Sequence, residues 1–252
     1  MGLEHRKLEE HKPARAGDGA LKVPAELVRE QPLDRLTLGE RAYARLSDLL
    51  MSGRLAPGEK ISLRATADVL GVSIMPVRAA VSRLVADKAL EVAPNRAIRV
   101  PIMSNTQFRD LTAARITIEG HTAALAAKLR NDADLSAIAA AEAAMRAESI
   151  VKKPNLPLAV EANKNFHFAV YQASQSSTLV GIIRALWLNV GPILNLDLRE
   201  NPERIRVGGA VRLHAEALDA IINRRPAKAR DAIAADIEGA AKFILSRGHL
   251  PD

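Results

Sequence analysis

The sequence predicts a mainly α-helical protein: an N-terminal winged helix-turn-helix of three helices and a β-hairpin wing, then an all-helical bundle of six or seven helices. Apolar residues make up 48% of the chain but aromatic residues only 3%, which favours helix-on-helix packing over sandwiches and barrels. The 252 residues suffice for two domains of ~100–150 residues each. Beyond residue 104, apolar residues recur with helical spacing and no strand pattern is found.

Composition excludes several classes of protein. The chain has no cysteine, which excludes disulfide frameworks and thiolate metal sites and fits a reducing cytoplasm. No apolar run approaches the ~18 residues needed to span a bilayer, and the charged N-terminus lacks the apolar core of a secretory signal. We therefore expect a cytoplasmic protein with no membrane partner. The net charge is +7, and residues 37–102 carry ten Lys or Arg against six Asp or Glu, a weak indication of a polyanionic partner.

The N-terminal elements follow from periodicity and capping residues. Residues 1–36 mix Gly, Pro and both charges, which is typical of a flexible tail. A first helix is predicted over residues 38–52, with Leu46 and Leu50 on its apolar face, and Gly53 ends it. Ser62 is a suitable N-cap for a second helix that runs to about Leu70.

A tight turn and a hairpin complete this part. Gly71 suits a left-handed helix end and Ser73 suits the next N-cap. The third helix is predicted from about Ile74 to Asp87, with Pro76 in its first turn, where a missing N–H is tolerated. Short alternating runs over residues 89–93 and 97–101 flank a tip that contains Arg96, which predicts a hairpin. This order of elements is typical of a winged helix-turn-helix, which we place at residues 37–102.

Helical periodicity continues to the end of the chain. We place the helical domain at residues 103–248, with the first helix either continuous or broken near Arg115. The predicted spans are 104–130, 132–151, 157–174, 176–199, 203–224 and 226–247.

The winged helix-turn-helix predicts which side chains meet DNA. The third helix should present its N-terminal end to a major groove, where Arg78 reaches a guanine edge or a phosphate and Ile74 offers only apolar contacts, for example to a thymine methyl group. The wing tip should meet a minor groove or the backbone. The candidate DNA-binding residues are Arg64, Ser73, Ile74, Met75, Arg78 and Arg96.

Polar residues on apolar helical stripes predict a second site. Asn163 and His167 lie four residues apart on one face. His214 lies about eleven residues before the turn at Arg225 and Pro226, and Asp236 about ten after it, so an antiparallel helical hairpin brings both to one level. Two imidazoles, one carboxylate and one amide oxygen suit a divalent metal, with Zn, Ni and Mn as candidates. The alternative is a set of core polar groups, each satisfied separately.

The N-terminal motifs carry a specific resemblance. The stretch LMSGRLAPGEKISLRATADVLGVSIMPVRAAVSRLVADKALEVAPNRAIRV resembles the DNA-binding domain of the GntR family of bacterial regulators. The match covers residues 38–101 almost continuously. Three residues depart from the family pattern, because Leu63 replaces Glu, Ile74 replaces Arg and Ala97 replaces Gly. The loss of a basic side chain at Ile74 should change sequence preference and weaken binding.

The helical part resembles the FCD effector domain of the FadR subfamily. The matching stretches are DLTAARITIEGHTAALAA, NKNFHFAVYQAS and HAEALDAIINRRPAKARDAIAADIEGA. The resemblance implies metal ligands at Asn163, His167, His214 and Asp236, where the family has one Asp and three His. The two substitutions imply retained but altered metal binding; the alternative is loss of the metal, with the pocket contacting the effector directly. The resemblance also implies that Arg115 pairs with an effector carboxylate; the alternative is a surface or interhelical salt bridge.

These observations lead to one main hypothesis and two alternatives. The main hypothesis is a homodimeric, non-enzymatic regulator, a repressor in most of this family, that binds an inverted repeat in double-stranded operator DNA and responds to a small organic acid. One alternative is a metal-dependent hydrolase or lyase that uses His167, His214 and Asp236, although no general base or nucleophile motif accompanies them. The other is a protein-interaction module with a vestigial winged helix.

Overall fold

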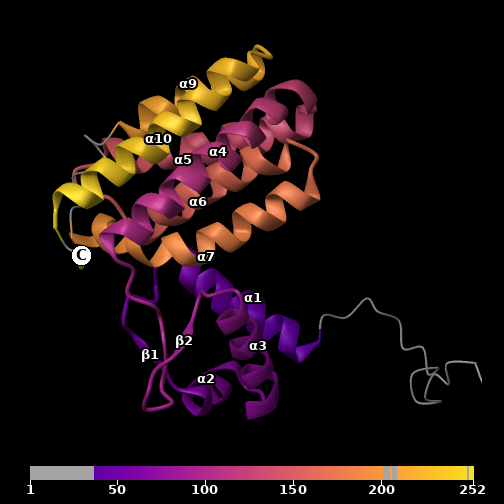
Figure 1. Ribbon diagram of the computed structural model, residues 1–252. Helices are drawn as coiled ribbons and strands as arrows, with labels where there is room; N and C mark the ends of the chain where they lie inside the picture. The colour runs from indigo at the N-terminus through magenta and orange to yellow at the C-terminus, as the bar shows by residue number, and fades with distance from the viewer. Residues whose placement is uncertain (1–36, 201–204, 206–208, 249) are drawn as a thin grey trace, which may run out of the picture. The chain divides into compact units, whose positions relative to one another are not determined.

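The computed structural model describes residues 37–200, 205, 209–248 and 250–252. The predicted tail, residues 1–36, lies outside the described residues. The N-terminal part contains three helices, α1 (Leu38–Met51), α2 (Leu63–Leu70) and α3 (Ile74–Ala86), followed by a hairpin (Figure 1). Each of these helices begins and ends within one residue of its predicted bounds.

Local chemistry explains where these helices begin and end. The hydroxyl of Thr37 caps α1, and the Glu40 side chain accepts a hydrogen bond in return from the Thr37 backbone, which is a capping box. Ser62 caps α2 as predicted, and Gly71 ends it in the left-handed region with φ 64°, where a residue with a Cβ atom is disfavoured. Ser73 occupies the N-cap of α3, but its side chain makes no capping hydrogen bond.

The wing belongs to a small antiparallel sheet. Strands β2 (Glu91–Val92) and β3 (Ile98–Arg99) form the predicted hairpin, although each strand is shorter than expected. A further strand, β1 (Lys60–Ile61), pairs with the other edge of β3, so the strand order is β1-β3-β2. Strand β1 was not predicted, because two residues are too few to show an alternating pattern.

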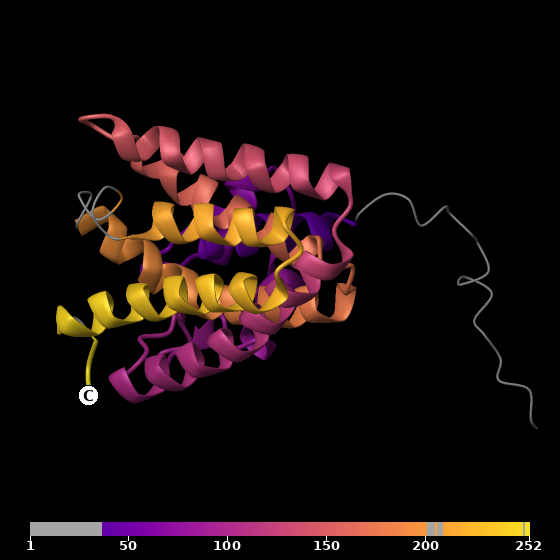
Figure 2. The same cartoon turned by 90° about the horizontal axis from the view of Figure 1, so that it is seen from above.

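The helical part begins after Ser104, whose hydroxyl caps the first helix in a second capping box. Figure 2 shows these helices from above, with α9 and α10 side by side. All regular elements described beyond Ser104 are helices, as predicted. They are α4 (Asn105–Leu129), α5 (Asp132–Ile150), α6 (Leu156–Gln172), α7 (Ser177–Glu200), α9 (Ala210–Ile222) and α10 (Pro226–Ser246).

Three expectations about this part need correction or restriction. The α4 helix runs without a break through Arg115, since neither Gly nor Pro interrupts that region. The helix predicted from residue 203 is described only from Ala210, after Gly209 as its N-cap. The window Ser177–Leu194 is long and apolar enough to cross a membrane by composition, contrary to the sequence analysis. However, 44% of this window is buried inside the protein, as in the core helix of a bundle.

Packing between sequence-distant helices builds the core of the bundle. The α10 helix packs against both α4 and α9, and α5 packs against α6. Because α4, α6, α9 and α10 approach one another, polar residues on their inward faces share one interior. The largest fully buried side chains in this part are Phe108, Ile138, Phe166, Tyr171, Ile183, Trp187, Leu188, Ile221 and Ile233.

Candidate DNA-binding face and candidate metal centre

The first turns of α3 are open to solvent. Met75 is 63% exposed and Ile74 38% exposed, although both are apolar. Arg78 is also exposed, one turn further along, whereas the side chain between them, Val77, is fully buried. The helix is therefore anchored by one face and presents the predicted contact residues on the other.

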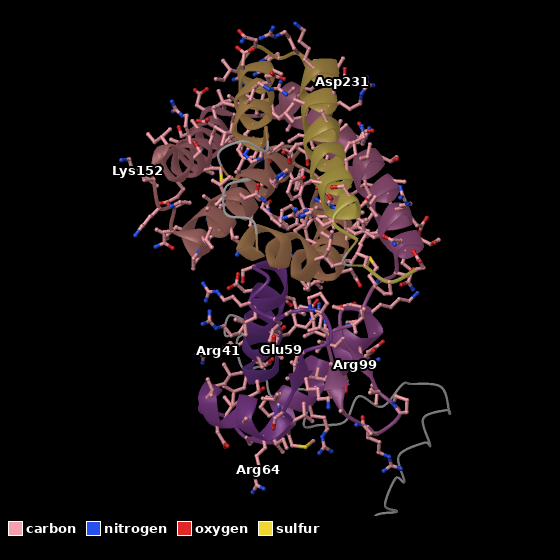
Figure 3. All side chains as sticks on the ribbon, turned by 90° about the vertical axis from the view of Figure 1, so that its left-hand side faces the viewer. Arg41, Glu59, Arg64, Arg99, Lys152 and Asp231 are labelled. Atoms are coloured by element: carbon pink, nitrogen blue, oxygen red, sulfur yellow. The ribbon has the colours of Figure 1, made fainter. Side chains whose placement is uncertain are left out.

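Two further basic side chains are exposed nearby in the sequence. Arg64 lies in the first turn of α2 and points away from the ribbon in Figure 3. Arg96 lies at the tip of the hairpin with a left-handed backbone, φ 61°. The tip is held by Asn95, whose side-chain oxygen accepts a hydrogen bond from the Ala97 backbone. An ordered turn thus carries the predicted basic residue of the wing.

The second predicted site is brought together inside the bundle. His167 Nε2 lies 3.2 Å from Asp236 Oδ2, and His214 Nε2 lies 3.7 Å from the same oxygen. One ligand atom from each residue lies within 4.8 Å of the others. These residues come from α6, α9 and α10, and the predicted facing of His214 and Asp236 across the α9–α10 hairpin is confirmed.

His214 is the least satisfied member of this cluster. Its side chain is completely buried and its ring stacks on Phe166, with 4.0 Å between the ring centroids. Among the described residues, neither ring nitrogen has a hydrogen-bond partner. A buried polar group left unsatisfied costs about 1–3 kcal/mol. The cluster therefore fits a cation that would accept a lone pair from His214.

The protonation states also fit a cation. Burial lowers the pKa of His167 below its usual value of 6.5, although Asp236 acts in the opposite direction. The lowered pKa favours the neutral ring at pH 7. Burial alone would raise the pKa of Asp236, but its contacts with His167 and His214 outweigh burial and lower it. Neutral imidazoles and an ionised carboxylate are the forms that bind metals.

A cavity adjoins the cluster. Its volume is about 40 Å³, and its lining includes Arg115, Asn163, His167 and Asp236 together with apolar residues such as Met145. Asn163, the fourth predicted ligand, is half-buried one turn before His167 on α6. Four of the five predicted residues of the helical part therefore line this cavity, and the fifth, His214, is buried beside Asp236.

Arg115 is buried rather than exposed, and its ion pair lies within its own helix. Its Nε lies 2.7 Å from Glu119 Oε1 and its Nη2 lies 3.2 Å from Glu119 Oε2. Burial acts against its charge, but Glu119 outweighs burial and raises the pKa of Arg115. The alternative of a surface or interhelical salt bridge is wrong for this conformation, because the partner lies one turn along α4.

Two further buried neighbours of this site, Tyr171 and Trp187, were not predicted, and both contact Glu119. Tyr171 donates to Glu119 and contacts His167, and Trp187 donates its indole N–H to Glu119 over 3.2 Å. Burial and the Glu119 charge raise the pKa of Tyr171 well above its usual value of 10.0. A signal was present, because Arg115 and Glu119, like His167 and Tyr171, are four residues apart on one helix.

Comparison with protein families gives two matches. Residues 38–100 match the model described as bacterial regulatory proteins, gntR family. Residues 110–239 match the model of the FCD domain. The first range contains α1–α3 and the small sheet, and the second contains His167, His214 and Asp236.

Individual proteins are also similar to this chain. The HTH-type transcriptional regulator McbR of Escherichia coli (strain K12) is 32% identical over 162 residues, which are 64% of this chain and 72% of the relative. The solved structure of E. coli McbR/YncC has a TM-score of 0.78 at 26% identity and covers 85% of this chain and 100% of its own. A transcriptional regulator GntR from Rhodococcus sp. RHA1 shares the fold, with a TM-score of 0.67 at 21% identity and coverages of 82% and 97%.

Proposed function

This chain belongs to the GntR family of bacterial regulatory proteins and carries an FCD domain, and from that premise we propose that it is a repressor controlled by a metal-assisted organic acid sensor. It is a DNA-binding transcription regulator and not an enzyme, as the family and its relatives indicate. The proposal concerns the contacts, the metal, the effector and the assembly. We assign residues 37–102 to the DNA-binding domain and residues 103–248 to the sensing domain.

The exposed start of α3 is the observation that carries the DNA-binding proposal. Ile74 and Met75 are apolar yet exposed, and a major groove offers thymine methyl groups that such side chains can cover. Arg78 supplies a hydrogen-bonding contact to a guanine edge or a phosphate. Ser73 and Arg64 contact bases or phosphates beside α3, and Arg96 reaches the minor groove or the backbone from the wing.

Fluorescence anisotropy on DNA from upstream of the chain's own coding sequence tests this proposal. The protein should bind one fragment tightly, and a titration at several salt concentrations should give a linear fall of log affinity with log salt. Arg78→Ala should weaken binding by about 1–3 kcal/mol, whereas Arg212→Ala, an exposed arginine of α9, should leave it unchanged. Equal binding by both variants would favour a protein-interaction module instead.

A divalent metal held by His167, His214 and Asp236 is the second part of the proposal. The donor set of two imidazoles and one carboxylate suits Zn, Ni or Mn, and the unsatisfied nitrogens of His214 support it. Asn163 lines the adjoining cavity as a further oxygen donor. The metal, when bound, supplies positive charge that attracts an anionic effector.

Metal content after gel filtration tests this part. The purified protein, loaded with each ion in turn, should retain about one equivalent of at least one of them. His214→Ala should lose it, and His121→Ala should keep it, because His121 is exposed on α4 away from the cluster. Retention of metal by His214→Ala would contradict the assignment.

The effector proposal rests on Arg115. Its guanidinium lines the cavity, and this group pairs with carboxylates through two parallel hydrogen bonds. Glu119 already accepts hydrogen bonds from Nε and Nη2 of Arg115, so an effector would use the remaining N–H donors of the guanidinium. A thermal-shift panel of small mono- and dicarboxylates, run with metal-loaded and metal-free protein, should identify stabilising acids.

The assembly follows from the same proposal. A homodimer in the cytoplasm, bound to an inverted repeat, would place one winged helix-turn-helix on each half-site. Light scattering during gel filtration should give twice the mass of 27.2 kDa for one chain. A monomer at micromolar concentration would contradict the dimer while leaving the DNA-binding proposal to its own test.

A further inference from the structure

A chain of hydrogen bonds lies behind His167, on the side away from Asp236. His167 Nδ1 lies 2.9 Å from the hydroxyl oxygen of Tyr171, and that hydroxyl donates to Glu119. Glu119 also accepts hydrogen bonds from Arg115 and Trp187. All five side chains are buried, and they come from three helices, α4, α6 and α7.

With the His167 ring neutral, the donors in this network of hydrogen bonds have one consistent arrangement. Arginine and tryptophan side chains can only donate, so Glu119 accepts from both and acts as a carboxylate. Tyr171 has a single hydroxyl hydrogen, which it gives to Glu119. Its oxygen must therefore accept the hydrogen of His167 Nδ1, and His167 is the tautomer whose Nε2 carries a lone pair.

That lone pair faces the candidate metal centre. Nε2 of His167 lies 3.2 Å from Asp236 Oδ2. In this tautomer the lone pair of Nε2 would face a lone pair of the ionised carboxylate, and the two would repel each other. A cation between the two atoms removes this repulsion. The hydrogen bond at one nitrogen of the ring thus decides what the other nitrogen can bind.

We propose that Tyr171 and Glu119 are positioning residues for the metal, because they hold His167 in the tautomer and ring orientation that present Nε2 to the ion. This inference rests on the metal site of the proposed function. Groups that orient a metal-bound histidine typically change metal affinity by about 10–100-fold. Tyr171 lies one turn from His167 on α6, and Glu119 lies one turn from Arg115 on α4. Because both residues lie on helices, their positions do not depend on the movement of a loop.

Two conservative variants test the role of these residues in the full-length chain. Tyr171→Phe removes only the hydroxyl, and Glu119→Gln removes the charge while keeping the shape. Cobalt titration of metal-free protein against a competing chelator should show affinity lowered by about 10–100-fold in each, with an altered visible spectrum of the bound cobalt.

The chain offers a matched control for each variant. Tyr43→Phe removes the hydroxyl of the only other tyrosine, which bonds to Asp87 in the N-terminal part. Glu142→Gln changes another buried glutamate, which pairs with Arg146 one turn along α5. Both controls should keep the cobalt affinity within about twofold of the parent, which is well below the effect expected of a positioning residue.

The outcomes separate this inference from the metal proposal. If the parent protein takes up no metal, the metal proposal fails and the positioning role fails with it. If the parent binds metal and a folded Tyr171→Phe binds it within twofold, only the positioning role is overturned. Nitrogen NMR of labelled histidine in the parent protein gives a test that needs no variant: a proton on Nδ1 of His167 is expected, and a proton on Nε2 alone would overturn the inference.

Discussion

Lys164 of α6 donates a hydrogen bond to Asp48 of α1, with 2.5 Å between Nζ and Oδ1. The preceding residue, Asn163, lines the cavity of the sensing part, and α1 belongs to the winged helix-turn-helix. One turn of α6 therefore contacts both the cavity and the first helix of the DNA-binding part. A shift of α6 on ligand binding would act directly on this ion pair.

A double-mutant cycle measures this connection. Lys164→Ala and Asp48→Ala should each lower the free energy of unfolding, and the pair should show a coupling of about 0.5–1 kcal/mol, because Asp48 is partly exposed and solvent screens the charge. Urea unfolding of the two single variants and the double variant gives this number. Strict additivity would show that the ion pair contributes nothing.

Gly191 of α7 lies directly against the backbone at the end of α1. A Cβ atom there would lie 2.6 Å from the Leu50 carbonyl oxygen and 2.8 Å from the Met51 Cα atom. Because both neighbours are backbone atoms, Gly191→Ala should lower the free energy of unfolding by about 1–3 kcal/mol. Gly181→Ala on the same helix has nothing within 4 Å and should raise it by about 0.5–1 kcal/mol. Thermal and urea unfolding measure both variants. If the two substitutions changed the free energy of unfolding equally, the close contact at Gly191 would be contradicted.

The apolar residue at the start of α3 predicts a gain of affinity on substitution. Ile74→Arg places a cation at an exposed position of the candidate DNA-binding face, so binding should tighten and the slope of log affinity against log salt should steepen by about 1. Ile150→Arg adds the same charge at the exposed end of α5 and should leave the slope unchanged. If Ile74→Arg and Ile150→Arg changed this slope equally, the gain would come from the net charge of the protein alone.

The pH dependence of the metal-free protein follows from His167. Its pKa in the folded protein lies below the usual value of 6.5 because burial disfavours the charged ring. The charges of Asp236 and Glu119 raise this pKa, whereas His214 lowers it further. Below pH 6.5 the unfolded chain therefore binds more protons than the folded one, and stability falls as the pH is lowered. The loss should approach about 1.4 kcal/mol per pH unit at most for one such group.

Thermal unfolding between pH 7 and pH 5, in the presence of a chelator, measures this dependence. His167→Gln should flatten the fall in stability, and His121→Gln should not. An unchanged slope in His167→Gln would show that another group is responsible.

Restoring a carboxylate at Asn163 should strengthen the metal site. Asn163→Asp would give the cavity a second acidic side chain beside Asp236, and we expect about a tenfold gain in affinity for a divalent ion, since each tenfold step needs only about 1.4 kcal/mol. The metal-free variant should be less stable, because two carboxylates then repel each other in a buried space. Weaker metal binding in this variant would place Asn163 outside the coordination sphere.

Local patterns in the chain were sufficient for most of the secondary structure. The caps at Ser62 and Gly71 lie where the sequence placed them, because capping depends on one side chain and its own backbone. The facing of His214 and Asp236 was also predictable from the sequence, because the two residues lie at similar distances on either side of a single turn. Strand β1 was missed because it has only two residues and its pairing partner, β3, lies almost forty residues away.

By itself the sequence determined the order of helices, the wing and the candidate ligands, since these depend on spacing along one or two neighbouring elements. The tertiary structure alone decided that Arg115 is buried against Glu119 and that Glu119 also receives Tyr171 and Trp187. It also set the distance of 3.2 Å between His167 Nε2 of α6 and Asp236 Oδ2 of α10, two residues that the sequence had assigned to one site. Such contacts depend on the rotation and spacing of helices packed side by side, which no periodicity within a single helix can define.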